Sequence, residues 1–201
     1  MKRPLNLLLC GALTALLLTG CGGTDASAPP TEDSAAPQDV QDTQDTPSTQ
    51  DTQFETLTPD VFSGHDLTLV NCFTTWCGPC VEEIPELNQL QTAYADRNVQ
   101  VIGVILDSKV PTDRNDTEGT LDQEAISQAA LIASRADIQY KFYLPDFSLF
   151  DGMLVDITAV PTTFFVNRQG EIVGETVTGA RDLDGWSQLV DQQLADLGHA
   201  E

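Results

Sequence analysis

Two cysteines, Cys77 and Cys80, stand three positions apart in the stretch TTWCGPCVEEIP, with only Gly78 and Pro79 between them. An apolar run precedes the pair and a helical pattern follows it, which places Cys77 directly ahead of a helix. Unpaired backbone N–H groups and the positive end of the helix dipole stabilise a thiolate at such a position. Cys80 comes round beside Cys77 and can attack a mixed disulfide, so the spacing suits thiol–disulfide exchange.

The same cysteines could instead form a structural disulfide or half of a zinc site. A structural disulfide closing so short a loop removes little entropy from the unfolded chain, so it would stabilise the fold weakly. A closed zinc site needs four ligands, and the remaining candidates, Cys72, His65 and His199, have no zinc-like spacing. We therefore expect a redox pair without metal or other cofactor, and Trp76 beside it would give a substrate peptide a flat apolar contact.

The residues around the pair predict alternating strands and helices. Short apolar runs indicate strands, and apolar residues at helical spacing indicate helices. The expected strands are 67–73, 99–106, 140–144, 163–167 and 172–178, and the expected helices are 80–94, 121–136, 147–154 and one from Asp182 to Leu197. Pro85 should bend the first helix, residues 107–119 should form a loop, and residues 168–170 should turn a hairpin. This order indicates an α/β domain with a mixed central sheet.

The first 20 residues resemble a targeting segment. Lys2 and Arg3 precede an apolar run that is shorter than the ~20 residues of a transmembrane helix, as in a secretory signal peptide. The end of this run, Leu18-Thr19-Gly20-Cys21, resembles the lipobox of bacterial lipoproteins. That resemblance implies cleavage before Cys21 and a lipid on its sulfur, which would anchor the protein to the outer side of the cell membrane. The alternative is an ordinary signal peptide with a chance cysteine.

Residues 21–53 predict a disordered tether. From Gly22 to Glu55 there are eight acidic residues and no Lys or Arg, and the tripeptide Gln-Asp-Thr occurs three times. Such a segment buries too little apolar surface to fold, and its charge keeps it extended. The whole chain carries 9 Lys and Arg against 31 Asp and Glu, a net charge of −22. Phosphate backbones would repel it, so we expect no nucleic-acid binding.

Two segments resemble the motifs of TlpA/ResA-like thiol–disulfide oxidoreductases, which are membrane-anchored members of the thioredoxin-fold proteins. LVNCFTTWCGPCVEEIPEL resembles their active-site segment, and AVPTTFFVNRQGEIV (159–173) resembles their cis-proline loop. The similarity covers roughly residues 54–197. It implies a thioredoxin-like fold for the domain 54–201, with a helix inserted after the central strand, within residues 110–135.

The resemblance also implies the roles of the residues at the pair. Cys77 would be the attacking nucleophile and Cys80 the resolving cysteine. Glu83 matches a glutamate that the family places near the pair, where a partly buried carboxyl moves protons during exchange. The alternative for Glu83 is a solvated helix charge like its neighbour Glu82. Cytoplasmic thioredoxins carry an acid at the position of Asn71, which favours the TlpA-like branch.

A second set of roles concerns substrate binding and the third cysteine. Pro161 would have a cis bond with Val160, whose backbone would pair with an incoming peptide, so Val160, Pro161 and Thr162 would line the substrate site. Cys72 stands where the family usually has an aromatic residue. We interpret Cys72 as a buried free cysteine that behaves as a small apolar residue; the alternative is a third redox-active thiol.

Together these inferences predict a lipid-anchored, extracytoplasmic protein-disulfide reductase that acts as a monomer. The family implies substrates such as apocytochrome c or methionine sulfoxide reductase, and a membrane electron donor of the CcdA/DsbD type. One alternative is a peroxiredoxin-like peroxidase, since Thr74 precedes Cys77 by three residues as in that family, although Val70 replaces its proline. Another alternative is a binding lipoprotein whose redox pair is idle.

Overall fold

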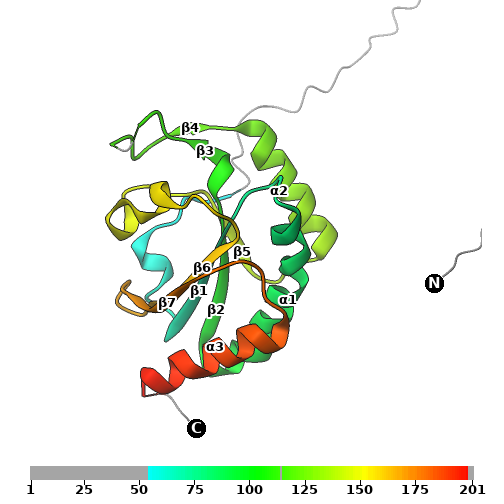
Figure 1. Cartoon of the computed structure of the whole chain (residues 1–201), viewed down its shortest axis with the longest axis vertical. Helices are drawn as coiled ribbons and strands as arrows, with labels where there is room; N and C mark the ends of the chain where they lie inside the picture. The colour runs from blue at the N-terminus through cyan, green and yellow to red at the C-terminus, as the bar shows by residue number, and fades with distance from the viewer. Residues whose placement is uncertain (1–53, 114, 199–201) are drawn as a thin grey trace, which may run out of the picture. The chain divides into compact units, whose positions relative to one another are not determined.

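The computed structural model of the chain describes residues 54–113 and 115–198 (Figure 1). The expected signal peptide (1–20), the lipid on Cys21 and the tether (21–53) lie outside these residues and stay predictions. Within the described part of the chain, no helix is long and apolar enough to cross a bilayer.

A five-stranded mixed sheet forms the centre of the domain, in the order β5-β2-β1-β6-β7. The strands β1, β2 and β5 run parallel, whereas β6 and β7 form an antiparallel hairpin beside β1. Their bounds are β1 (Leu67–Phe73), β2 (Val99–Ile105), β5 (Lys141–Tyr143), β6 (Thr162–Asn167) and β7 (Ile172–Thr178). The predicted mixed sheet and the hairpin at residues 168–170 are confirmed, because buried strands and turn residues leave strong local signals.

Three helices, α1 (Gly78–Tyr94), α2 (Gln123–Ala136) and α3 (Leu183–Asp196), pack on one face of this sheet (Figure 1). The helix α1 begins two residues earlier than predicted and continues through Pro85. Pro79 occupies its first turn, where the missing N–H had no partner to lose. The helix α3 was predicted to start at Asp182, and Asp182 is its cap, since its carboxylate accepts from the N–H of Gly185 at 2.9 Å.

Among residues 54–113 and 115–198, no long helix covers the other face of the sheet. It is covered by two 3-10 segments, η1 (Pro59–Val61) and η4 (Leu149–Asp156), and by apolar side chains around them. Side chains along β1 alternate between the two cores, so that Leu69 and Phe73 belong to the helix-covered core, whereas Val70 and Cys72 belong to the opposite one. We call these the helix face and the 3-10 face.

The segment between β2 and α2 differs from its prediction. Residues 107–119 were expected to form a loop, but they include part of η3 (Leu106–Ser108) and β3 (Lys109–Val110), which pairs with β4 (Thr120–Leu121). The prediction that Leu121 starts a helix is wrong, because Leu121 lies in β4 and is 40% exposed. The Asp122 carboxylate accepts from the N–H groups of Glu124 and Ala125, so the helix begins only after it.

The short helix expected at residues 147–154 is instead the 3-10 segment η4, which ends two residues later. Its course is broken at Phe150, Asp151 and Gly152, all of which have positive φ angles. Gly152 adopts such a conformation without the steric cost of a side chain. The segment therefore bends at residues 150–152 and packs with its apolar side chains on the 3-10 face.

Candidate active site at the amino end of α1

Cys77 and Cys80 form a disulfide with a Cα–Cα distance of 5.3 Å, so the structure represents the oxidised chain. Cys77 is the N-cap residue of α1, and its sulfur accepts from the N–H of Cys80 at 3.3 Å. Cys80 is fully buried, while Cys77 retains 6% of its surface. Cys77 is therefore the sulfur that a partner from outside can reach, and the helix end stabilises negative charge on it.

The peptide bond between Val160 and Pro161 is cis, as the family resemblance implied. The carbonyl oxygen of Val160 lies 3.7 Å from the Sγ atom of Cys77. The loop is tied to the sheet, because Thr162 donates its hydroxyl to Ala159 and the Pro161 carbonyl accepts from Gly179. The Val160 carbonyl is therefore held beside the Cys77 sulfur.

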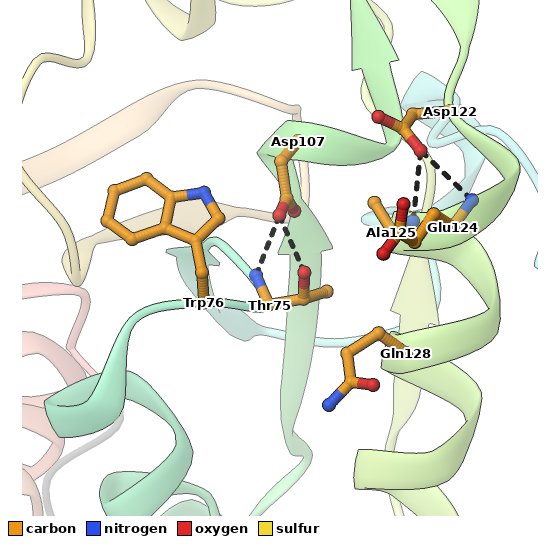
Figure 2. Close-up of a pocket in the computed structure, with 7 residues that line it drawn as sticks. All are labelled: Thr75, Trp76, Asp107, Asp122, Glu124, Ala125 and Gln128. Carbon is orange, nitrogen blue, oxygen red and sulfur yellow. Dashed lines mark hydrogen bonds between the residues drawn. The ribbon is translucent and has the colours of Figure 1, made fainter.

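Trp76 lies beside the pair and is 74% exposed, which makes its ring available to a partner. The neighbouring Thr75 is fixed, since its N–H and its hydroxyl both donate to one carboxylate oxygen of Asp107, at 2.9 and 2.7 Å (Figure 2). Trp76 and Asp107 line a cavity of about 360 Å³ that reaches the amino end of α2. Asp107 thus connects the loop before Cys77 to the end of β2.

Glu83 is buried on the helix face, with 2% of its surface exposed. Its Oε1 atom accepts from the backbone N–H of Arg181 at 2.7 Å and from the indole N–H of Trp186 at 2.9 Å. Its Oε2 atom accepts from the side-chain amide of Asn71 at 3.1 Å. Glu83 is therefore not a solvated helix charge, unlike the exposed Glu82 beside it in the chain.

Burial raises the pKa of Glu83 above the ordinary glutamate value of 4.5, and the hydrogen bonds from Arg181, Trp186 and Asn71 act in the opposite direction. A pocket of about 260 Å³, lined among others by Pro79 and Arg181, connects Glu83 with the surface. A buried carboxyl that is easier to protonate than usual, with access to solvent, has the properties of a proton carrier.

Cys72 is fully buried and makes no disulfide. Burial raises the pKa of its thiol far above the ordinary range, which keeps it protonated. It lies on the 3-10 face, whereas Cys77 and Cys80 lie on the helix face. This placement agrees with the interpretation of Cys72 as a small apolar residue and gives it no access to the pair.

Several residues of the site were not recognised from the sequence. Asp107 and Thr163 gave no signal, and Trp186 lies within the predicted helix from Asp182 to Leu197 without any predicted role. A buried tryptophan usually finds an acceptor for its N–H. This tendency is the signal in the sequence that indicates a hydrogen bond from Trp186, although it does not identify Glu83 as the acceptor. Among residues 54–113 and 115–198, no group of three or more His, Cys, Asp or Glu side chains could hold a metal ion.

Comparison with known proteins defines the class first. The model of the AhpC/TSA family matches residues 38–174, and the chain belongs to this family. The structure of a thiol:disulfide interchange protein of the thioredoxin family from Chlorobium tepidum TLS covers 67% of this chain and 83% of its own, with 23% identity and a TM-score of 0.50. The predicted thioredoxin-like fold is thereby confirmed.

The individual relatives are thiol–disulfide oxidoreductases. The thiol-disulfide oxidoreductase ResA of Oceanobacillus iheyensis is 29% identical over 119 residues, which are 58% of this chain and 51% of that protein. The sporulation thiol-disulfide oxidoreductase A of Bacillus subtilis is 22% identical over 107 residues, which are 52% of this chain and 55% of that protein. The chain thus spans about half the length of these relatives. Their names agree with the ResA-like resemblance of the two motifs.

Proposed function

We propose that this protein reduces disulfide bonds of other proteins through the Cys77–Cys80 pair. The observation that carries the proposal is the arrangement of the pair. Cys77, which retains 6% of its surface, stands at the start of α1, and its sulfur lies 3.7 Å from the Val160 carbonyl of the cis-proline loop. An accessible thiolate with a resolving thiol beside it is what thiol–disulfide exchange requires. The ResA-type relatives support the same reaction class.

The reaction begins with the reduced pair. The Cys77 thiolate attacks one sulfur of the target disulfide; a bond forms between the two sulfurs, and the other target sulfur leaves as a thiolate that takes a proton. The Cys80 thiolate then attacks the Cys77 sulfur, which forms the Cys77–Cys80 disulfide and releases the second target thiolate. Two electrons pass from the pair to the target, and the oxidised product is the form seen in the structure.

Glu83 serves the second step. Cys80 is fully buried and has to lose its proton before it can attack. Glu83 lies one helical turn after Cys80, and as a carboxylate it accepts this proton and passes it to solvent through the pocket beside Pro79. The raised pKa of Glu83 reduces the mismatch between the carboxyl and the thiol, which favours the transfer.

The location and partners belong to the same proposal. The pattern around Cys21 supports a lipid anchor on the extracytoplasmic face of the membrane, with residues 21–53 as a tether. Disulfide-containing proteins such as apocytochrome c or methionine sulfoxide reductase would be substrates of the monomeric protein. A membrane protein of the CcdA/DsbD type would return electrons to the pair, because each turnover leaves the pair oxidised.

The reduction potential of the Cys77–Cys80 pair tests the direction of electron flow. We would equilibrate the protein with glutathione or dithiothreitol buffers and quantify the disulfide by mass spectrometry after alkylation. A potential near −250 mV or below, as in thioredoxin-type reductants, supports a reductase, whereas a value of about −120 to −180 mV indicates an oxidant or isomerase. If no Cys77–Cys80 disulfide forms in any buffer, the redox function is excluded and a binding role takes its place.

The Cys80→Ser variant tests the mixed-disulfide route. Without the resolving thiol, Cys77 should remain covalently attached to its target, and the adduct should disappear on addition of dithiothreitol. The Cys77→Ser variant is the matched control and should form no adduct. A Cys80→Ser protein that consumes peroxide at the wild-type rate and captures no target would instead favour the peroxidase.

A further inference from the structure

The side chain of Asn71 joins three elements at the active site. Asn71 lies on β1 with 1% of its surface exposed. Its amide nitrogen donates to Glu83 Oε2 on α1 at 3.1 Å and to the hydroxyl of Thr163 on β6 at 2.9 Å. Asn71 and Thr163 are also opposite each other in the β1–β6 register. Both hydrogen bonds are therefore made by one NH₂ group in a closed environment.

The donors to Glu83 are of two kinds. The backbone N–H of Arg181 and the indole N–H of Trp186 can only donate, and both bind Oε1. The Asn71 amide carries a donor end and an acceptor end of nearly the same shape. The Thr163 hydroxyl can likewise donate or accept. The donor and the acceptor of the hydrogen bond at Oε2 can thus exchange roles, whereas the two hydrogen bonds at Oε1 have fixed donors.

This difference matters when Glu83 takes up a proton. The proton goes to Oε2, because Oε1 already accepts two fixed hydrogen bonds. The new O–H would then point at the N–H group of Asn71, donor against donor. A buried hydroxyl without an acceptor is costly, so an unchanged Asn71 would oppose protonation.

We propose that the Asn71 amide turns by half a revolution whenever Glu83 is protonated. In the turned state its Oδ1 atom accepts from the Oε2–H of Glu83 and from the hydroxyl of Thr163, which reverses from acceptor to donor. In each state the amide then keeps two hydrogen bonds, one with Glu83 and one with Thr163, and no bond to Glu83 Oε1 changes. Asn71 is accordingly a positioning residue that lets a buried carboxyl exchange a proton without losing a partner.

The inference rests on the proposed proton-carrying role of Glu83 and adds a route by which that proton is sensed. Thr163 follows the cis Pro161 by two residues on β6. Reversal of its hydroxyl therefore links the protonation of Glu83 to the strand that begins at the peptide-binding loop. The proton released by Cys80 would therefore change hydrogen bonds both at Glu83 on α1 and at Thr163 on β6.

Other titratable groups surround the same carboxyl and have to be separated from it. The Arg181 side chain lowers the Glu83 pKa through its charge. Burial raises the pKa of the Tyr140 hydroxyl, and the charge of Glu83 adds to this shift. Three further carboxyls, those of Glu82, Glu86 and Asp182, line the pocket beside Glu83. A reporter on Asn71 itself is needed to distinguish rotation of its amide from changes at these neighbouring groups.

Nuclear magnetic resonance of the protein labelled with ¹³C and ¹⁵N supplies that reporter. The NH₂ signals of Asn71 and the carboxyl carbon of Glu83 would be followed between pH 4 and 10, in the oxidised and the reduced protein. We expect the Asn71 signals to shift with the same midpoint as the Glu83 carbon. Nuclear Overhauser contacts from the NH₂ protons to the Glu83 and Thr163 side chains should be present at high pH and lost at low pH.

The proton affinity of Glu83 in two variants, each with an apolar side chain in place of one donor to Glu83, gives a second measurement. Trp186→Phe removes a fixed donor that favours only the carboxylate, so it should increase the proton affinity of Glu83 by on the order of tenfold. Asn71→Leu removes a partner of both states, so its effect on the proton affinity should be clearly smaller. Equal increases in the two variants would mean that Asn71 acts as a fixed donor, which overturns the inference.

The outcomes separate the inference from the function beneath it. If the Asn71 contacts persist while Glu83 titrates, the amide does not turn, yet the proton role of Glu83 stands. If Glu83 keeps one protonation state throughout, both the amide rotation and the proton role are wrong. If the wild-type protein did not reduce protein disulfides while the Asn71 amide turned with Glu83, the proposed function alone would be wrong.

Discussion

Cys80 and Cys72 are both fully buried, but they lie on opposite faces of the same sheet. Cys80 forms the disulfide with Cys77 at the start of a 17-residue helix. Cys72 is a free thiol among apolar side chains such as Val70 and Ile102. Equal burial therefore goes with very different chemistry, and the neighbours of each sulfur account for the difference.

The helix face supplies what a reactive sulfur needs. It has an N–H group at the start of α1 that donates to the Cys77 sulfur, a buried carboxyl with its donors, and a small exposed part of Cys77. The 3-10 face is covered by short segments, and burial there simply suppresses ionisation of the Cys72 thiol. A cysteine becomes reactive where the fold stabilises its thiolate, and it remains a small apolar residue where the fold does not.

The largest expected effect comes from replacing one cysteine on each face of the sheet by serine. Cys77→Ser should lose all catalysed reduction of a protein disulfide, because the attacking sulfur is gone. Cys72→Ser should keep the wild-type rate when folded, since Cys72 has no access to the pair. The rates would be compared by following reduction of insulin with dithiothreitol as electron donor. A strong loss of activity in folded Cys72→Ser would refute the separation of the two faces.

The next effect concerns the buried carboxyl. Glu83→Gln should slow the release of a trapped mixed disulfide by about 10²-fold, the lower range of general acid–base contributions. Glu82→Gln removes an exposed charge one position earlier and is the matched control, with an unchanged release rate. Stopped-flow measurements of both variants against pH would show whether the wild-type profile contains a step that only Glu83→Gln removes.

The same residue affects stability with pH. Since burial raises the folded-state pKa of Glu83 above its ordinary value of 4.5, the unfolded chain ionises first as pH rises. The stability contributed by protonated Glu83 is thus complete below pH 4.5 and is lost as pH rises through the folded pKa. The difference in unfolding free energy between wild type and Glu83→Gln should decline over that window, as measured by urea unfolding.

The smallest expected effect is on the 3-10 face. Cys72→Ala should lower the free energy of unfolding by about 1 kcal/mol through the small cavity it leaves. Cys72→Ser should cost more, about 1–3 kcal/mol, because its buried hydroxyl would lack a partner. Urea unfolding of the two variants gives the order. If serine were the less costly replacement, the surroundings of Cys72 would contain an acceptor, contrary to their apolar description.

The sequence predicts the strands of the central sheet well, but it predicts the short strands β3 and β4 and the start of α2 less well. The strands β1 and β6 follow from buried apolar runs, and the more exposed β7 follows from the turn that joins it to β6. The strands β3 and β4 have two residues each, with Val110 and Leu121 exposed, so they leave no alternating pattern to recognise. The apolar spacing predicts a helix from Leu121, whereas the Asp122 carboxylate caps α2 and the helix begins after it.

The candidate site divides in the same way. Cys77, Cys80 and Glu83 lie within one short motif, so their spacing is visible along the chain. The donors to Glu83 come from positions 12 to 103 residues away in the chain. Asp107 reaches Thr75 across 32 residues. Contacts of this kind arise only when the sheet brings β1, β2 and α3 together, and a single sequence does not contain that information.

The chain contains two tryptophans, and they occupy opposite ends of the site. Trp76 is largely exposed next to the disulfide, whereas Trp186 is fully buried with its indole on Glu83. Because disulfides quench indole emission at short range, the fluorescence of Trp76 should rise when the pair is reduced. Trp186 should emit at shorter wavelength and respond to the charge of Glu83. The protein thus carries two intrinsic optical probes, one for electrons and one for protons.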